Sequence, residues 1–339
     1  MPFPGRVASF ALAAGLLAAG ASVLSRRRSS AAFARGQCVL VTGGSRGLGF
    51  MLAEAFARAD ARVTICARSA EELERAASRL AEEGLHVESR ICDVRDRLQC
   101  EALVREVEAR GGPLDILINN AGTIEVGPLA DQTVDDFREA MDTHFWGPLY
   151  LMLAVLPGMR ARRGGRIVNI ASVGGLVGVP HLAPYCASKF AQVGLTQAVA
   201  AEAAADGVQI TSVCPGLMYT GSPDHAFFKG RYRAEYAWFA ISDANPMLSV
   251  SPEAAVRRIL RAIRRGEAQA LIGTLPKVAK TLNALFPETT SRLLALSARM
   301  LPPSGGVGTE RRSGADSHSA VAPSILTLAD RRSVPRTNQ

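Results

Sequence analysis

Short apolar runs alternate with stretches of helical pattern along most of this 339-residue chain. From Gln37 onward the runs read QCVLVT, RVTIC, HVESRIC, LDILIN, GRIVNIAS and VQITSVC, and a helical stretch follows each of the first five. Strands that are apolar on both faces are typical of a parallel sheet covered by helices on both sides. We therefore expect an α/β fold with a single doubly wound parallel sheet.

The same alternation sets the domain boundaries. One α/β domain is expected over residues 36–300, because 48% hydrophobic residues in a chain of this length suffice for one large core. Residues 216–250 depart from the alternation and read as a loop that holds seven aromatic residues. Helices are predicted over residues 70–83, 97–109, 134–159 and 184–205, with a further helix opened by Ser251 and Pro252, a last strand at 268–273 and a final amphipathic helix over 276–300.

The N-terminus reads as a separate segment, residues 1–35. Residues 7–24 are uncharged and rich in Ala, Gly and Leu, and three arginines follow at 26–28. That length and the basic flank predict a short membrane anchor, with the catalytic domain on the cytoplasmic side. A cleaved targeting peptide and a soluble apolar appendage are the alternatives, because the stretch is only weakly hydrophobic and the segment contains no acid.

The C-terminal residues 301–339 are rich in Ser, Gly, Pro and Arg, so we expect a disordered tail. Residues 1–35 contribute +5 and residues 301–339 contribute +2 to the net charge of +8, which leaves residues 36–300 near +1. A nearly neutral domain has no electrostatic footprint for nucleic acid. The six cysteines lack the spacing of a disulfide framework or a zinc site, and four lie in apolar runs. We therefore predict buried core thiols and no metal site.

A glycine-rich sequence, VLVTGGSRGLG, stands where the first predicted strand gives way to a helix. Gly43, Gly47 and Gly49 permit a tight turn and a close approach of the backbone to phosphate. The free amides and the positive end of the following helix stabilise a pyrophosphate. Such a loop alone is a weak signal, but its position after the first strand predicts the dinucleotide site of a Rossmann fold.

The second strand indicates which dinucleotide binds. It ends Cys66, Ala67, Arg68, with no acid to hydrogen-bond an adenosine ribose. Arg46 lies in the glycine loop, and two guanidinium groups suit a 2′-phosphate because they offer charge-assisted, forked hydrogen bonds. NADP(H) is therefore the predicted cofactor. Alternatively, one or both arginines are solvated surface residues.

Ser172, Tyr185 and Lys189 form a second constellation. Tyr185 and Lys189 are four residues apart on a predicted helix, so both project from one face about one turn apart. A free phenol has a pKa of about 10, and a nearby ammonium and an oxidised nicotinamide ring are expected to lower it. Ser172 ends a predicted strand, where it can hydrogen-bond a substrate oxygen. We therefore predict hydride transfer between NADP(H) and a carbonyl/alcohol pair, with Tyr185 as general acid or base.

These motifs resemble the short-chain dehydrogenase/reductase family over roughly residues 37–272. The matching phrases are TGGSRGLG at 42–49, CDV at 92–94, NNAG at 119–122, Ser172, YCASK at 185–189 and PGLMYT at 215–220. The resemblance implies a homo-oligomer built on the fourth and fifth helices.

The resemblance also implies roles for residues at the cofactor. Asp93 and Val94 would flank the adenine, Asn120 and Ala121 would lie beside the cofactor ribose, and Thr220 would contact the nicotinamide amide. Lys189 would also hold the nicotinamide ribose hydroxyls. With the glycine loop, the expected cofactor-binding set is Gly43, Ser45, Arg46, Gly47, Leu48, Gly49, Arg68, Asp93, Val94, Asn120, Ala121, Gly122, Tyr185, Lys189, Pro215, Gly216, Met218 and Thr220.

One position departs from the family's pattern. The family usually carries Asn in its long fourth helix, in a phrase like NxxG, where it helps to hold a water that links the lysine to solvent through a break in the helix. This chain reads His144, Phe145, Trp146, Gly147 there. His144 is therefore a further catalytic candidate. It could keep the backbone part of that role, its imidazole could relay protons, or it could be a packed residue that fills the space. His181 is either at the mouth of the pocket or a polar surface residue.

The aromatic residues of 216–250 predict a lid over a bulky apolar substrate such as a lipid, steroid or polyketide-like ketone. Alternatively, they pack the lid onto the domain or form a dimer contact. A non-catalytic NADP(H)-binding sensor or scaffold is a second hypothesis, although intact Ser172, Tyr185 and Lys189 argue against it because a binding module needs no activated phenol. A protein that mainly tethers to membranes through residues 1–35 is a third.

Overall fold

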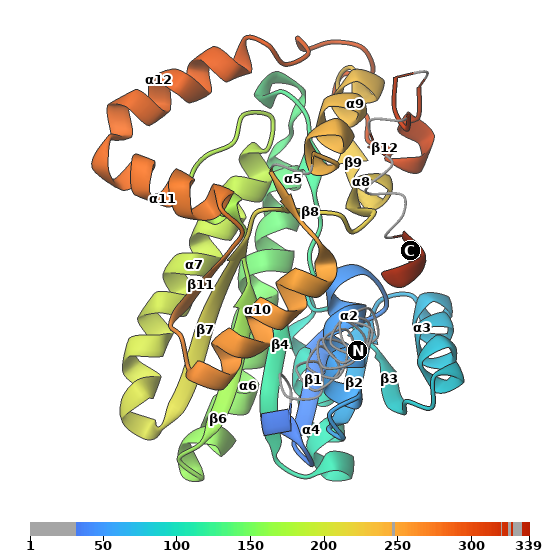
Figure 1. Cartoon of the computed structure of the whole chain (residues 1–339), viewed down its shortest axis with the longest axis vertical. Helices are drawn as coiled ribbons and strands as arrows, with labels where there is room; N and C mark the ends of the chain where they lie inside the picture. The colour runs from blue at the N-terminus through green and yellow to red at the C-terminus, as the bar shows by residue number, and fades with distance from the viewer. Residues whose placement is uncertain (1–31, 246–247, 320, 325–326, 328–333) are drawn as a thin grey trace, which may run out of the picture.

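The computed structural model describes residues 32–245, 248–319, 321–324, 327 and 334–339. A parallel sheet lies at its centre, in the strand order β11-β7-β6-β4-β1-β2-β3 (Figure 1). The strand order reverses between β1 and β4, which confirms the predicted doubly wound sheet. The strands are β1 (Cys38–Thr42), β2 (Arg62–Ala67), β3 (Val87–Ile91), β4 (Leu114–Asn119), β6 (Gly165–Ile170), β7 (Val208–Pro215) and β11 (Gln269–Ile272).

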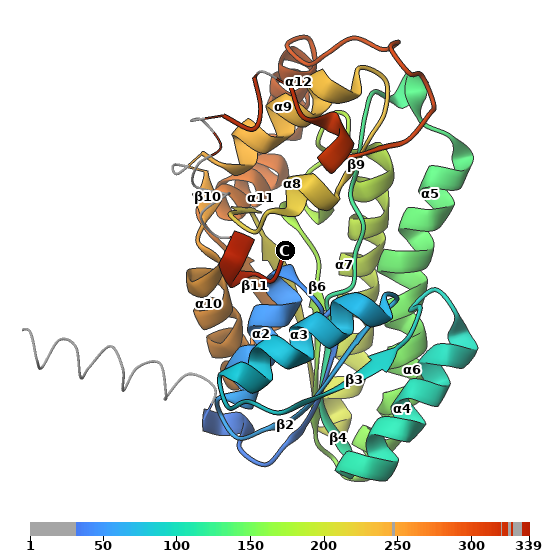
Figure 2. The same cartoon turned by 90° about the vertical axis from the view of Figure 1, so that its right-hand side faces the viewer.

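Helices cover both faces of the sheet (Figure 2). One layer consists of α2 (Gly47–Ala57), α3 (Ala70–Glu82) and α10 (Pro252–Arg265), and the other of α4 (Arg97–Gly111), α6 (Gly147–Ala161) and α7 (Ala183–Ala203). Each layer packs its own set of buried side chains against the sheet, with Phe56 on one side and Leu151 on the other. The strands therefore need apolar residues at successive positions, and β1 is buried at all five.

The predicted helix over residues 134–159 is interrupted. α5 (Val134–Met141) passes into a π-helical segment, η3 (Asp142–Trp146), before α6 begins. A π-helical turn inside a helix is rare, and the turns that do occur are often found at functional sites. The helical pattern on each side predicts one long helix and does not reveal the extra residue in the turn, whereas the family resemblance implied a break in this helix near His144.

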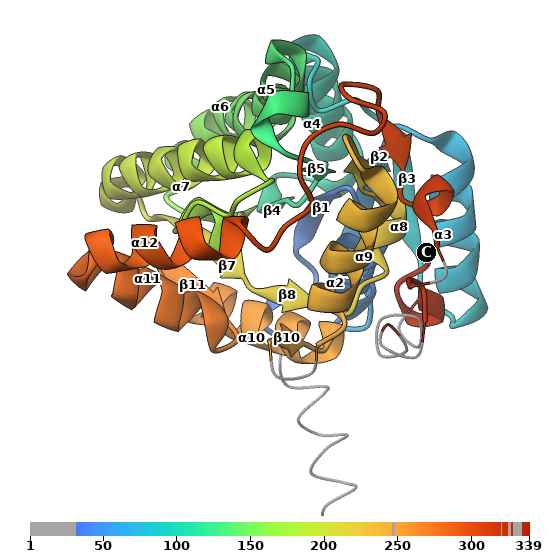
Figure 3. The ribbon, with the colours of Figure 1, turned by 90° about the horizontal axis from the view of Figure 1, so that it is seen from above.

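Two other predictions of local structure are corrected. Residues 216–250 contain the helices α8 (Ser222–His225) and α9 (Tyr232–Asp243) as well as loop. The expected single helix over 276–300 is two helices, α11 (Leu275–Leu285) and α12 (Pro287–Ala298), which lie at the β11 edge of the sheet (Figure 3). Pro287 begins α12, and a proline disfavours helical dihedrals in the residue before it. Phe286 accordingly has φ −135° and ψ 61°, and the helix breaks there.

Part of the C-terminal tail is folded, although we expected disorder over residues 301–339. β12 (Arg312–Ser313) pairs with β9 (Phe227–Phe228), which in turn pairs with β5 (Glu125–Val126). Arg311 forms ion pairs with Glu125 and with Glu139, the latter at 2.8 Å. Composition did not indicate this order, because the stabilising partners lie more than eighty residues away in the sequence.

Within the described ranges, no helix is both long and apolar enough to cross a membrane. The predicted anchor over residues 7–24 lies outside these ranges. All six cysteines are buried and free, which confirms that they are core thiols.

Candidate active site

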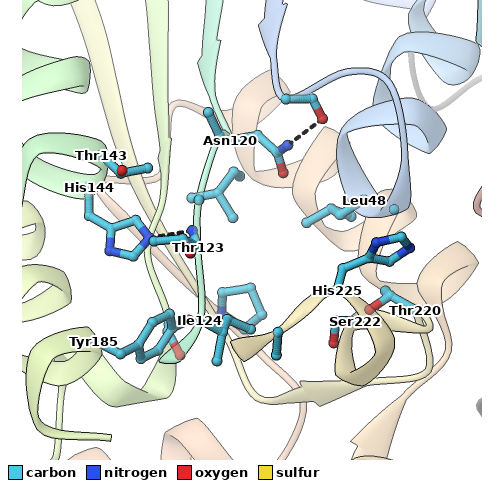
Figure 4. Close-up of a pocket in the computed structure, with 18 of the residues that line it drawn as sticks. Leu48, Asn120, Thr123, Ile124, Thr143, His144, Tyr185, Thr220, Ser222 and His225 are labelled. Atoms are coloured by element: carbon cyan, nitrogen blue, oxygen red, sulfur yellow. Dashed lines mark hydrogen bonds between the residues drawn. The ribbon is translucent and has the colours of Figure 1, made fainter. Parts of the chain in front are cut away.

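A cavity of about 790 Å³ lies at the carboxyl ends of the central strands. Every predicted catalytic and cofactor-binding residue lines it except Gly49. Tyr185 and His144 lie on one side of this cavity, and Leu48 and Thr220 lie on the other (Figure 4). The structure therefore brings the glycine loop and the Ser-Tyr-Lys constellation to one site, at the edge where open α/β sheets bind ligands.

The glycine loop requires glycine for two different reasons. Gly43 and Gly47 have φ of +61° and +60°, a region in which a side chain is strained. Gly49 instead packs behind the loop, where an added Cβ would lie 2.2 Å from the Gly43 carbonyl oxygen and 2.4 Å from the Asn120 amide nitrogen. Thr42 Oγ1 accepts hydrogen bonds from the two backbone amides that follow β4, at 2.9 and 3.0 Å. The loop is thus fixed against the end of β4.

The nucleotide end of the cavity contains an acid that the sequence analysis did not identify. Glu72 Oε1 lies 2.5 Å from Arg46 Nη1, and Ser45 Oγ donates a hydrogen bond to Glu72 Oε2 at 3.1 Å. Arg68 lines the same end. Glu72 stands three residues after Ser69, which caps α3. That spacing is typical of a capping box, so the sequence signal indicated a helix cap and not a partner for Arg46.

Tyr185 and Lys189 face the cavity from α7. The Lys189 Nζ atom lies 5.8 Å from the centroid of the Tyr185 ring. It donates hydrogen bonds to Ile170 O at 2.8 Å and to Gln192 Oε1 at 3.1 Å. An ammonium has three N–H donors, so one remains for a ligand. The four-residue spacing therefore placed both groups at the site as predicted.

Ser172 follows β6 and begins the short helix η4 (Val173–Gly175). Its Oγ accepts a hydrogen bond from the backbone amide of Gly174 at 3.1 Å. It also shares a hydrogen bond with the Tyr185 side chain. Ser172 therefore acts as a local cap, as many strand-ending serines do, and also contacts the phenol.

Burial dominates the acidity of both titratable groups. It raises the pKa of Tyr185 to about 12 because the phenolate loses solvation, and the hydrogen bond with Ser172 opposes this rise. Burial lowers the pKa of Lys189 to about 7, because the ammonium loses solvation. The expected lowering of the Tyr185 pKa is therefore not observed in the protein alone. The part of that expectation that depends on an oxidised nicotinamide requires the bound dinucleotide.

His144 occupies the middle of η3 and is fully buried. Its Nε2 accepts a hydrogen bond from the Thr123 backbone amide at 3.1 Å (Figure 4). Its Nδ1 lies 2.8 Å from Ser188 Oγ. The Ser188 hydroxyl donates its own proton to the backbone carbonyl oxygen of Tyr185 at 2.8 Å. Nδ1 must therefore carry the proton, and burial lowers the pKa of this imidazole, so the ring is neutral.

With both nitrogens engaged, the imidazole has no nitrogen left to accept a relayed proton. Its ring packs edge-on against the Tyr185 ring, with centroids 5.4 Å apart. We therefore interpret His144 as a positioning residue, which links the segment after β4 to the helix that carries the phenol. This agrees with a packed residue rather than a proton relay.

The helix α9 belongs to the segment 216–250 that was predicted to be a lid, and it presents Trp238 and Phe239 to the cavity. Glu235, on the same helix, is fully buried and accepts a hydrogen bond from Trp238 Nε1 at 2.6 Å. The other partner of Glu235 is His181 Nδ1, at 2.9 Å. His181 thus does not line the cavity but fixes the lid from the loop before α7. No sequence signal connects these residues, because they are 54 positions apart.

The chain matches the short chain dehydrogenase family over residues 37–226. A Streptomyces coelicolor protein to which ketoacyl reductase activity is ascribed is 41% identical over 186 residues, which cover 54% of this chain and 71% of that protein. The dehydrogenase/reductase SDR family member 7B of Bos taurus is 30% identical over 275 residues, which cover 79% of this chain and 83% of the relative.

Solved structures show the same likeness. A short-chain dehydrogenase from Streptomyces avermitilis superposes with a TM-score of 0.66 at 27% identity, over 78% of this chain and 98% of that one. A variant actinorhodin polyketide ketoreductase, solved with NADPH, gives a TM-score of 0.62 at 34% identity, over 70% of this chain and 95% of that one. The sheet order, the motifs and these matches agree, and the chain belongs to the short-chain dehydrogenase/reductase family of NAD(P)(H)-binding oxidoreductases.

Proposed function

We propose that this chain is an NADP(H)-dependent oxidoreductase that interconverts a carbonyl and an alcohol, with Tyr185 as general acid or base. The observation that carries the proposal is that Ser172, Tyr185 and Lys189 face the same cavity as the glycine loop. This cavity fits a dinucleotide, because Gly49 closes the loop where a Cβ has no room and the N-terminus of α2, with its positive helix dipole, points at the loop.

The preference for NADP(H) rests on Arg46 and Arg68, which both line the nucleotide end of the cavity. Their charges and forked donors suit a 2′-phosphate. The similar polyketide ketoreductase was solved with NADPH, which supports the same choice. Glu72 opposes it in part, because its carboxylate occupies Arg46.

When bound, NADPH supplies a hydride to the carbonyl carbon. Tyr185 donates its phenolic proton to the substrate oxygen, and Ser172 stabilises the developing alkoxide by a hydrogen bond. Because the pKa of Tyr185 is about 12, the phenol is protonated and ready to donate at neutral pH. In the oxidation direction the same oxygen must first lose its proton and then accept one from the alcohol.

The substrate end of the cavity supports a bulky apolar substrate. Trp238, Phe239, Leu248 and Leu275 line it, and Glu235 holds the Trp238 indole in place. A panel of ketones, aldehydes and alcohols, read by NADPH absorbance, tests both the activity and this substrate class. Binding of NADPH without oxidation across the whole panel would favour the alternative of a sensor or scaffold. A preference for small hydrophilic carbonyls would overturn the apolar substrate.

Oxidation and reduction are expected to respond differently to pH. Oxidation needs the Tyr185 phenolate, which becomes more abundant as pH rises towards its pKa, whereas reduction needs the phenol, which persists below that value. The rate of alcohol oxidation should therefore rise between pH 6 and pH 10, while protonation of Tyr185 places no limit on reduction near neutral pH. Initial rates in both directions across this range provide the check. An oxidation rate that falls as pH rises would contradict the assignment.

Glu72→Gln is expected to strengthen NADPH binding about fivefold and to leave NADH binding unchanged, because it frees Arg46 and removes a negative charge beside the 2′-phosphate. Fluorescence titration of each dinucleotide measures the two dissociation constants. Glu71→Gln is the matched control, since Glu71 is an exposed neighbour on the same helix and loses the same charge. Equal gains for NADPH and NADH would argue against a 2′-phosphate site at Arg46.

Two further expectations remain proposals. We propose a homo-oligomer that uses α6 and α7, which expose Leu153 and Phe190, and light scattering in solution tests it. We also propose membrane attachment through residues 7–24, with the catalytic domain in the cytoplasm. Fractionation of cells that express the chain with and without residues 1–35 tests the attachment.

A further inference from the structure

Residues 334–339, here called the C-terminal strap, lie at the nucleotide end of the cavity beside α2 and α3 (Figure 2). The carbonyl oxygen of Thr337 accepts a hydrogen bond from the backbone amide of Gly47 at 2.6 Å. Asn338 Nδ2 donates to the backbone oxygen of Ser45 at 2.7 Å, and Gln339 lines the cavity. The strap therefore contacts the glycine loop through two consecutive residues.

The amide that Thr337 occupies belongs to the first residue of α2. The first amides of a helix have no partner within the helix, and these are the groups that bind phosphate in a dinucleotide site. The Gln339 side chain fills adjacent space, because a Cβ added to Gly47 or Gly221 would lie within 3.2 or 2.7 Å of its amide group. A peptide carbonyl and a phosphate oxygen cannot both occupy this position.

The strap is also attached away from the phosphate position. Thr337 is fully buried, and its Oγ1 donates to the backbone oxygen of Thr220 at 3.1 Å. Arg336 Nη1 lies 2.9 Å from Glu253 Oε1, at the start of α10. Earlier in the same tail, Arg311 and β12 fix the chain to β9 and α5. A segment tethered in this way competes with a dinucleotide phosphate for the Gly47 amide at a high effective concentration.

From these contacts we propose that the strap is an autoinhibitory segment, which occludes the pyrophosphate position and must leave before NADP(H) binds. The inference rests on the proposed function in that it takes the cavity to be a dinucleotide site. A strap that is closed about nine-tenths of the time weakens the apparent affinity for the dinucleotide about tenfold. The chain would then be most active when the strap is held away from the glycine loop or has been removed.

Deletion of residues 334–339 tests the proposal. We expect the shortened chain to bind NADPH about tenfold more tightly than the full chain, measured by calorimetric titration without substrate. The melting temperature of each chain without ligand shows whether the deletion disturbs the fold. Equal affinities, or weaker binding by the shortened chain, would overturn the proposal, and weaker binding would show that the strap clamps the dinucleotide. If neither chain binds NADPH, the proposed cofactor and the proposed autoinhibitory role of the strap are both overturned. If both chains bind NADPH equally tightly, only the role of the strap is overturned.

A charge reversal tests the same idea in the full-length chain. Arg336→Glu and Glu253→Arg each place like charges together, so each should release the strap and strengthen NADPH binding by about two- to fivefold. The double variant restores an ion pair with its charges exchanged and should return the affinity to that of the unmodified chain. Arg264→Glu on α10 is the matched control, because this exposed arginine lies outside the cavity. Single variants that match Arg264→Glu in affinity would overturn the attachment at Glu253.

Discussion

Tyr185→Phe is expected to lower the rate of carbonyl reduction by about a thousandfold while it leaves the affinity for NADPH nearly unchanged. Proton transfer by a positioned side chain contributes about 10²–10⁴-fold to a rate, and this variant removes the proton while it keeps the ring. The ring contacts, including the edge-on packing with His144, should persist. Single-turnover oxidation of NADPH measures the chemical step, and a titration without substrate measures binding.

Tyr150→Phe is the matched control for this experiment. Tyr150 lies on α6, packs on the core and stacks on Trp146, and it does not line the cavity. We therefore expect its loss of a hydroxyl to leave the reduction rate within about twofold, as is usual for a change away from the reacting atoms. A Tyr185→Phe variant that retains more than about a tenth of the activity would refute the role of the phenol.

Gly49→Ala is expected to abolish measurable dinucleotide binding and to lower the melting temperature by several degrees. The new Cβ would lie 2.2 Å from the Gly43 carbonyl oxygen, which is backbone and cannot move without distorting the loop. Overpacking of this kind costs about 1–3 kcal/mol of folding free energy. Thermal denaturation and NADPH titration measure the two effects.

The chain offers a glycine that separates loop sterics from a general effect of substitution. Gly194 is exposed within α7, and a Cβ there meets nothing within 4 Å. Gly194→Ala should therefore leave binding intact and raise stability by about 0.5–1 kcal/mol, because alanine favours a helix interior. Equal behaviour of the two variants would show that Gly49 is not required for close packing.

The sheet and the placement of Ser172, Tyr185 and Lys189 at one cavity were predictable because local signals determine them. An apolar strand such as β1 must be buried on both faces, so its sequence alone predicts a position inside a sheet that is covered on both sides. Tyr185 and Lys189 share one helix, so their spacing alone predicts that they face the same site. Ser172 joins them because the carboxyl ends of parallel strands meet at one edge.

The features that the sequence did not predict depend on partners far along the chain. Glu72 stands at a spacing from Ser69 that is typical of a helix cap, and only the fold places Arg46 against it. His181 and Glu235 meet only because the lid folds over the loop before α7. The tail pairs with β9 despite a composition typical of disorder. The break between α11 and α12 could have been predicted from the sequence, because Pro287 lies at that position.

The placement of the thiols offers a way to watch this protein move. Cys186 adjoins Tyr185 and packs in the cluster under the lid, whereas Cys38 and Cys100 are buried between the sheet and α4 and do not line the cavity. An alkylating reagent should therefore reach Cys186 whenever α9 lifts, and should reach Cys38 and Cys100 only when the sheet itself opens. The order in which these three sulfurs are labelled would separate opening of the lid from unfolding of the domain.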